Sequence, residues 1–307
     1  MNAAMSESDV RLSLGPIQYH WPKETMLEFY RAIESTPVEI VYLGETVCSK
    51  RRSFRHSDWI DVAKRLRDAG KEVVLSTLAL LEAHSELGYI RKLCSNQDFQ
   101  IEANDVSAVQ MLADKTKFVG GASLNIYNSR SLNKLAAMGM TRWVMPVELS
   151  KNVLAGFLQE IPSDIETEVF AWGHLPLAYS ARCYTARTRK ISKDDCANCC
   201  IDDPDGLLLS TREDEEFLVI NGIQTQSAKM HSLIHEAGGG SGANILRISP
   251  QSEHTVQVIS LFDQVRKGVL NAGDAADKLE SLAAFGLCNG YWHGSAGMDY
   301  CSTVRQP

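Results

Sequence analysis

The chain has 307 residues, 44% hydrophobic and 22% charged, a composition typical of folded proteins that excludes intrinsic disorder along most of its length. Its formal net charge of −7 argues against a protein that coats nucleic acid through overall charge. No apolar run reaches the roughly 18 residues of a membrane span, and the first ten residues lack the features of a secretory signal. We therefore expect a cytoplasmic protein without a transmembrane segment.

Short β-branched or aromatic runs alternate with longer stretches of helical period along the chain. Strands are expected at residues 12–14, 39–43, 72–76, 99–103, 118–121, 142–145, 168–171 and 245–248. Helices are expected at residues 23–35, 57–69, 83–94, 104–115, 129–138, 150–160 and 252–266. Ser57 and Asp58 can cap the second of these helices, and Gly70 and Gly139 follow the second and fifth, where a left-handed residue is wanted.

Regular alternation of strand and helix implies parallel strands joined by right-handed crossovers. Eight such units fit a (β/α)8 barrel of the TIM type, which takes about 250 residues. The segment 174–243 breaks the rhythm, and we interpret it as an insertion between strands seven and eight. The expected fold is therefore an α/β, TIM-barrel-like domain over 11–307 with a cysteine-bearing insertion, after a disordered stretch over 1–10. A doubly wound open sheet is the competing architecture.

In such a barrel, function sits at the carboxyl ends of the strands. Polar side chains that follow expected strands include Glu45, Asn125, Glu148 and His174. We take these four as candidate substrate-binding residues. Polar residues at such positions are also common as helix caps, so their placement alone does not prove a site. The sequence identifies no catalytic residue.

The chain contains eight cysteines, and four of them cluster as Cys183-x12-Cys196-x2-Cys199-Cys200. In a reducing compartment such clustering indicates metal ligands or redox groups rather than structural disulfides. Neighbouring side chains diverge, so one of the adjacent pair is expected to point away, and a fourth ligand must come from elsewhere. Cys48 is the best distant candidate, because it follows a strand and precedes a Lys-Arg-Arg run. Zinc and an iron–sulfur cluster both accept four thiolates, and this pattern does not decide between them.

Other motifs were weighed and set aside. His231 and His235 stand four residues apart, but the glutamate of a zinc-protease motif is missing, so we interpret them as ordinary histidines of an amphipathic helix. The glycine-rich stretch 238–242 follows an expected helix and precedes a strand, the reverse of a dinucleotide-binding loop. No G-x-S-x-G or G-x-x-x-x-G-K-[ST] motif occurs. Cys94 is expected to be buried, and Cys288 and Cys301 remain ambiguous.

Several blocks are familiar as a set. They are Tyr19-His-Trp-Pro-Lys-Glu-Thr25, Val47-Cys-Ser-Lys-Arg-Arg52, Gly173-His-Leu-Pro-Leu-Ala-Tyr-Ser-Ala-Arg-Cys183, Asn221-Gly-Ile-Gln-Thr225 and Cys288-Asn-Gly-Tyr-Trp292. In this order the chain resembles the ubiquinone-biosynthesis members of the collagenase-like peptidase superfamily. The resemblance runs from about residue 11 to near the end. Despite the superfamily's name, peptidase activity is not implied.

The resemblance implies a [4Fe–4S] cluster held by Cys48, Cys183, Cys196 and Cys200, with Cys199 as a bystander. It also implies oxygen-independent ring hydroxylation in anaerobic ubiquinone biosynthesis. The implied partners are the homologous subunit UbiU, as a heterodimer, a lipid-binding accessory protein and the ubiquinone precursor. No nucleic acid is expected. RNA-base hydroxylation, known among other superfamily members, and a non-catalytic scaffold role are the alternatives.

Overall fold

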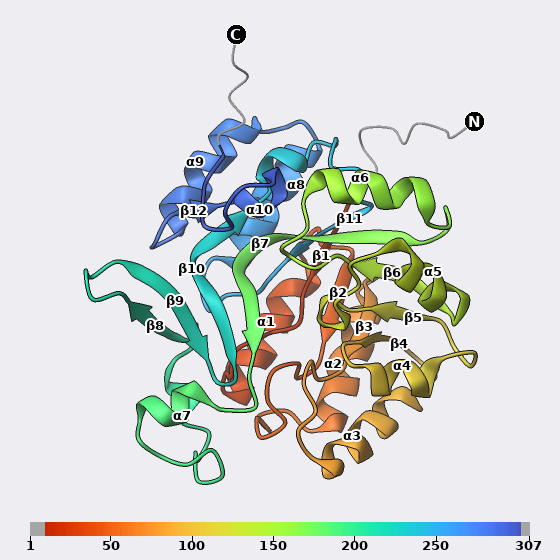
Figure 1. The fold of residues 1–307 in the computed structure, drawn as a ribbon, viewed down its shortest axis with the longest axis vertical. Coiled ribbons are helices and arrows are strands. Elements are labelled where there is room, and N and C mark those ends of the chain that lie inside the picture. The colour runs from red at the N-terminus through yellow and green to blue at the C-terminus, as the bar shows by residue number, and fades with distance from the viewer. Residues whose placement is uncertain (1–9, 302–307) are drawn as a thin grey trace.

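The computed structural model describes residues 10–301 of the chain. Within that range, eight parallel strands close into a barrel surrounded by helices (Figure 1). The ring closes because the last barrel strand pairs with the first strand on one side and with the seventh on the other. The predicted TIM-barrel-like fold is therefore confirmed, and the open sheet is excluded. The barrel strands are β1 (Arg11–Leu14), β2 (Ile40–Leu43), β3 (Glu72–Ser76), β4 (Gln100–Ala103), β5 (Phe118–Gly120), β6 (Met140–Val144), β7 (Glu166–Tyr179) and β11 (Ile245–Ile248).

Helices pack on the outside of the barrel and bury the outward-facing apolar residues of the strands. Leu12, Val41 and Leu75 on the strands belong to the same buried cluster as Tyr30 and Leu66 on the helices. Because successive side chains of a strand point to opposite faces, the alternate positions face the barrel interior, where Ile40, Val74 and Ile245 form a second buried cluster. The covering helices are α1 (Lys23–Glu34), α2 (His56–Asp68), α3 (His84–Cys94), α4 (Val106–Leu112), α5 (Ser129–Ala137), α6 (Lys151–Glu160) and α8 (Thr255–Arg266).

The helix ends lie close to the predicted residues, and the predicted capping residues Asp58 and Gly139 occupy helix ends. Helix α2 begins at His56, and Asp58 accepts a hydrogen bond from the Arg55 backbone N–H at 2.8 Å, so its carboxylate caps the first turn. Gly139 has a φ of +108°, and a Cβ there would lie 3.1 Å from the Thr116 carbonyl oxygen. Glycine is therefore required where α5 turns back into β6.

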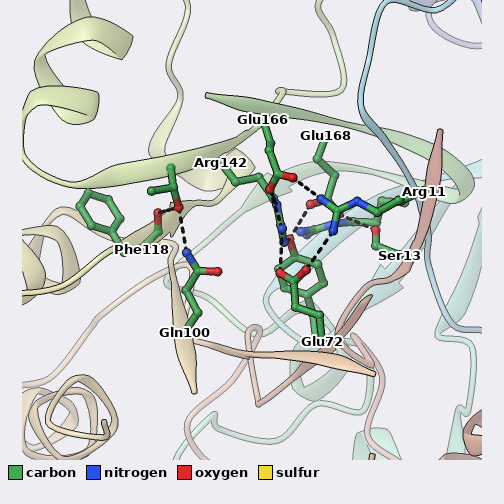
Figure 2. A network of polar contacts seen from close by, with 11 residues as sticks. Arg11, Ser13, Glu72, Gln100, Phe118, Arg142, Glu166 and Glu168 are labelled. Atoms are coloured by element: carbon green, nitrogen blue, oxygen red, sulfur yellow. Dashed lines mark hydrogen bonds and ion pairs between the residues drawn. The ribbon is translucent and has the colours of Figure 1, made fainter. Parts of the chain in front are cut away.

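The barrel interior carries an ionic network near the amino ends of the strands (Figure 2). Arg142 on β6 bonds to Glu72 on β3 at 2.7 Å and to Glu166 on β7 at 2.7 Å. Arg11 on β1 pairs with the same two glutamates, which closes a four-residue ring. Arg142 is only 3% exposed, so its charge depends on these partners rather than on water.

The segment between β7 and β11 forms a second structural unit. Strand β7 continues beyond the barrel to Tyr179 and pairs antiparallel with β10 (Gln224–Ser232), which pairs with β9 (Glu216–Asn221) and then β8 (Leu207–Ser210). Figure 1 shows β8 and β9 extending away from the barrel, with α7 (Tyr184–Thr188) beneath them. Between α7 and β8 lies the 3-10 helix η2 (Cys199–Asp202). The insertion thus begins inside a strand rather than at its end.

The interpretation of His231 and His235 as histidines of one helix was wrong. His231 lies on strand β10, and His235 lies in the short 3-10 helix η3 (Ile234–Glu236). The His231 ring is 3% exposed and stands 6.0 Å from the ring of Phe170. Its neighbours Met230 and Ser232 on β10 are buried as well, a setting that a four-residue histidine spacing does not reveal.

The short 3-10 helix η1 (Ala122–Leu124) follows β5. The carboxyl-terminal part is completed by α9 (Ala272–Leu282), β12 (Leu287–Cys288) and α10 (Gly290–His293). None of the helices that the structure describes is both long and apolar enough to cross a bilayer. The disorder predicted for residues 1–10 falls, apart from Val10, outside the described residues.

Candidate metal centre and barrel cavity

Cys48 lies on the loop that follows β2, at the carboxyl end of the barrel. The loop folds around Glu45, whose Oε1 accepts hydrogen bonds from the backbone N–H groups of Val47 at 2.9 Å and Cys48 at 3.0 Å. The backbone N–H of Arg51 donates to the Cys48 carbonyl at 3.0 Å. Glu45 thus serves as the internal cap of a tight turn, and this turn positions Cys48.

The other clustered cysteines come from the insertion. Cys183 caps α7, and its Sγ accepts from the Ala186 backbone N–H at 3.4 Å. The backbone N–H of Cys199 donates to the Cys196 carbonyl at 3.0 Å, in the turn that leads into η2. Arg189 at the end of α7 reaches back to the segment that follows, because its guanidinium bonds Asp202 at 2.7 Å and Asp203 at 2.6 Å. These contacts hold α7 and η2 against each other.

These two distant segments meet at one small cavity. Its lining includes all four predicted ligands and also Cys199. These five thiols form no disulfide, and each of the five cysteines is partly exposed. We predicted that one cysteine of the adjacent pair points away from the others. In the structure, both Cys199 and Cys200 line the cavity. The predicted ligands at this cavity are Cys48, Cys183, Cys196 and Cys200.

The donor set fits a group that takes four thiolates. Thiolate sulfur is the ligand of iron–sulfur clusters and of structural zinc. The cavity between these side chains is small, about 20 Å³. In residues 10–301, no group of three or more Cys, His, Asp or Glu side chains is already arranged to hold a metal ion.

Cationic groups surround the thiols. Arg51 is buried and donates to the Gln18 carbonyl at 2.5 Å and to Asn221 Oδ1 at 2.6 Å. Burial raises the pKa of the Cys48 and Cys200 thiols, and the positive charge of Arg51 opposes that rise on both. Gly222 makes this approach possible, since its φ is +66° and a Cβ would lie 2.9 Å from Arg51 Nη2. Arg51 therefore supplies a fixed positive charge beside the cavity.

A separate cavity of about 340 Å³ opens at the carboxyl end of the barrel. Asn125 and Glu148 both line it. Asn125 adopts a left-handed conformation with a φ of +53°, which asparagine tolerates better than most residues. Glu148 is hydrogen-bonded to the Tyr127 hydroxyl. Two of the four predicted substrate-binding residues therefore share this barrel cavity.

Arg247 and Glu102 form the charged floor of the barrel cavity. Arg247 on β11 bonds Glu168 at 2.7 Å and Glu102 at 2.8 Å, and its guanidinium lies 4.0 Å from the centre of the Tyr42 ring. Asn104 donates to Glu102 at 3.2 Å. Sequence reasoning missed Arg247 and Glu102, although a lone charge at an inward position of an apolar strand is the pattern that marks them.

The other two predicted residues lie elsewhere. Glu45 is the turn cap behind Cys48 and faces a neighbouring cavity. His174 lies within β7 rather than after a strand, because β7 continues past the barrel. Its Nδ1 is 2.8 Å from the Ser227 carbonyl oxygen, and it lines a different cavity with Asp205. Burial lowers the pKa of His174. The structure therefore separates Glu45 and His174 from Asn125 and Glu148.

Comparisons with known proteins give curated relatives and solved structures. A tRNA hydroxylation protein P from Haemophilus influenzae is 35% identical over 79 residues, which is 25% of this chain and 17% of that protein. The chain thus spans less than a fifth of the length of this relative. The U32 peptidase Mk0906 aligns with a TM-score of 0.46 at 10% identity over 82% of this chain and 97% of that one. A DAHP synthase from Thermotoga maritima aligns with a TM-score of 0.42 at 10% identity over 88% and 71%.

The family comparison covers most of the chain. The model of peptidase family U32 matches residues 25–299, a range that includes the turn at Cys48, the whole insertion and most of the residues that line the barrel cavity. The first barrel strand lies just before this range, and the last described element, α10, lies within it. The chain therefore belongs to peptidase family U32.

Proposed function

We propose that this chain is the iron–sulfur subunit of an oxygen-independent hydroxylation system in anaerobic ubiquinone biosynthesis. It would act with the homologous subunit UbiU on the ubiquinone ring precursor, in the role of UbiV, whose motifs it resembles. The observation that carries the proposal is the meeting of Cys48 with three insertion cysteines at one cavity. Family membership and the name of the Haemophilus relative support a hydroxylation role.

Cys48, Cys183, Cys196 and Cys200 would hold a [4Fe–4S] cluster, which supplies one-electron redox chemistry when it is bound. Arg51 would offset the negative charge of four thiolates, because its guanidinium is buried and fixed by Gln18 and Asn221. Lys50 bonds Asp194 at 2.6 Å and the Lys193 carbonyl at 2.9 Å, which ties the Cys48 turn to the insertion. The two segments are therefore linked independently of the thiols.

The barrel cavity is the proposed place for the ring precursor. Its volume of about 340 Å³ lies within the usual range for small-molecule sites. Met145 and Phe170 offer apolar surface to a ring, while Arg247 can donate to a ring oxygen and Glu102 can accept from a ring hydroxyl. Because Arg247 and Glu102 are held by each other, their positions do not depend on a ligand.

The cluster assignment is tested by anaerobic purification. We expect a brown protein with about four irons and broad absorption near roughly 400 nm. Cys48→Ala should lose the iron, whereas Cys199→Ala should retain it and serves as the matched control within the same cavity. A colourless wild type that carries one zinc would contradict the proposal. Iron loss in the Cys199 variant together with retention in the Cys48 variant would overturn the ligand set.

RNA-base hydroxylation is the second candidate, and the name of the Haemophilus relative favours it. The net charge of −7 weighs against it, since RNA binding draws on basic surface. A deletion strain grown without oxygen separates the two. Loss of ubiquinone with normal RNA supports the first proposal, and an RNA base that lacks its hydroxyl group with normal ubiquinone supports the second.

A further inference from the structure

A third cavity, of about 480 Å³, lies beside the cysteine-lined cavity and belongs to neither site described above. It opens between the loop after Cys48, the start of α2 and the start of α3. Its inner wall is apolar and largely aromatic. The apolar side chains that line it are Ile17, Met26, Phe54, Trp59, Leu78 and Tyr89.

The rim of this cavity carries excess positive charge. Five lysine and arginine side chains line it, against two carboxylates. Arg52, Arg55 and Lys92 are exposed, and the structure shows no ion pair from any of their side chains to another described residue. Unpaired cations gathered above an apolar wall leave a positive field that no protein carboxylate neutralises.

The two carboxylates of the lining are already engaged. Glu86 accepts hydrogen bonds from the Ser49 hydroxyl and from the backbone N–H groups of Glu82 at 2.7 Å and Ala83 at 3.1 Å. Glu45 caps the turn before Cys48. Glu45 also pairs with Arg51 at 3.9 Å, so neither carboxylate pairs with Arg52, Arg55 or Lys92. In addition, the Nδ1 atom of His56 is buried at this cavity without a hydrogen-bond partner among the described residues.

We propose that this cavity binds an amphiphilic organic anion, a flat apolar ring that bears a carboxylate or a phosphate. The ring packs against Trp59 and Tyr89, and the oxyanion is held by Arg52, Arg55 and Lys92. Guanidinium groups recognise carboxylate and phosphate oxygens through paired hydrogen bonds, and aromatic walls accept a flat ring. Lys50 and Arg51 line both this cavity and the cysteine cavity, so the bound anion lies directly beside the thiols. The inference does not depend on which group the thiols hold.

Titration calorimetry on the purified full-length protein tests the proposal. The probes are 2-naphthoate, 2-naphthyl phosphate and the neutral 2-naphthalenemethanol, which share one ring system. We expect one site per chain and at least about tenfold tighter binding of an anion than of the alcohol, as charge-assisted hydrogen bonds require. Whichever anion binds more tightly identifies the oxyanion that the rim prefers.

Variants place the binding at this cavity. Arg52→Gln with Arg55→Gln should weaken the preferred anion by about tenfold or more and leave the alcohol unchanged. Ser85→Trp, at the mouth, should weaken all probes by filling the entrance. Lys64→Gln, an exposed cation on the same helix α2 but outside the cavity, is the matched control. Equal binding of the alcohol, equal weakening by Lys64→Gln, or unchanged binding in Ser85→Trp overturns the proposal. Iron content, measured on the same samples, tests the cluster separately.

Discussion

The barrel interior and the cysteine-lined cavity are built on opposite principles. In the barrel, Arg142 and Arg247 are fixed by carboxylates on a neighbouring strand, β7, and on strands across the barrel, β3 and β4, and every pair lies on the parallel sheet. At the cysteine cavity, the thiols stand on a turn, a short helix and a 3-10 segment whose ties are mostly local. The barrel charges are paired with one another, although the buried Nη2 of Arg247 has no hydrogen-bond partner among the described residues, whereas no hydrogen bond joins one thiol to another in residues 10–301. The barrel pairs therefore hold without a ligand, and the proposed cluster would supply the link that the thiols lack.

Removal of the proposed iron–sulfur cluster should have the largest effect on local stability. After anaerobic chelation of the metal, we expect amide hydrogen exchange in residues 183–203 to rise by about a hundredfold or more, because binding free energy of such groups is folding free energy. Exchange in β1, β2 and β11 should stay unchanged. Hydrogen exchange with mass spectrometry measures both regions in one sample. Equal loosening of the barrel would remove the contrast between the two regions.

Removal of one barrel charge should come next. Arg247→Met leaves Glu102 and Glu168 buried without a cation, and we expect about 3–5 kcal/mol lower free energy of unfolding. Urea denaturation followed by circular dichroism measures it. Adding Glu168→Gln to that variant should recover part of the loss, since one buried charge is then removed. A variant as stable as the wild type would show that the barrel pairs are not required.

Acid should weaken the junction between the two regions. Burial lowers the pKa of His231 to about 4, with His293 adding repulsion and the Phe170 backbone hydrogen bond opposing the shift. Between about pH 6.5 and 4, His231 is therefore protonated in the unfolded chain and neutral in the folded chain. Stability from this group is complete above pH 6.5 and is lost as pH falls, by about 3 kcal/mol. Unfolding curves of His231→Phe should show a smaller loss over this window than the wild type.

The smallest effect should follow loss of an exposed tie. Arg189→Ala removes the bonds to Asp202 and Asp203 that link α7 to η2. Exposed ion pairs contribute little, so we expect no change in the midpoint of global unfolding. Local exchange around 199–203 should rise slightly in the metal-free protein. A shifted global midpoint would mean that the insertion and the barrel unfold as one unit.

The sequence allowed the barrel to be predicted because strand and helix periods alternate along most of the chain. The sequence pattern also predicted that Cys48 lies near the cysteine cluster, since a strand end and a clustered motif point to one face, whereas the choice of Cys200 over Cys199 rested on the family resemblance. The full length of β7 was not predicted. Its last residues, Leu175 to Tyr179, are held in the strand by pairing with β10, a segment distant in sequence. Arg247 and Glu102 were missed for the same reason, since each looks like an isolated charge until the ring of strands closes.

The pairing of β11 with both β1 and β7 has a consequence for how the chain is made. In this register Arg11 of β1 pairs with Ile245 of β11. One edge of β1 therefore stays unpaired until the ribosome has synthesised the chain as far as β11. Contacts of such long sequence separation slow folding, and an uncovered parallel edge is a template for association with other chains. All four candidate thiols emerge from the ribosome before that closing strand, in a chain whose barrel is still open. A nascent chain that stalls before Ile245 is therefore the form of this protein most exposed to aggregation.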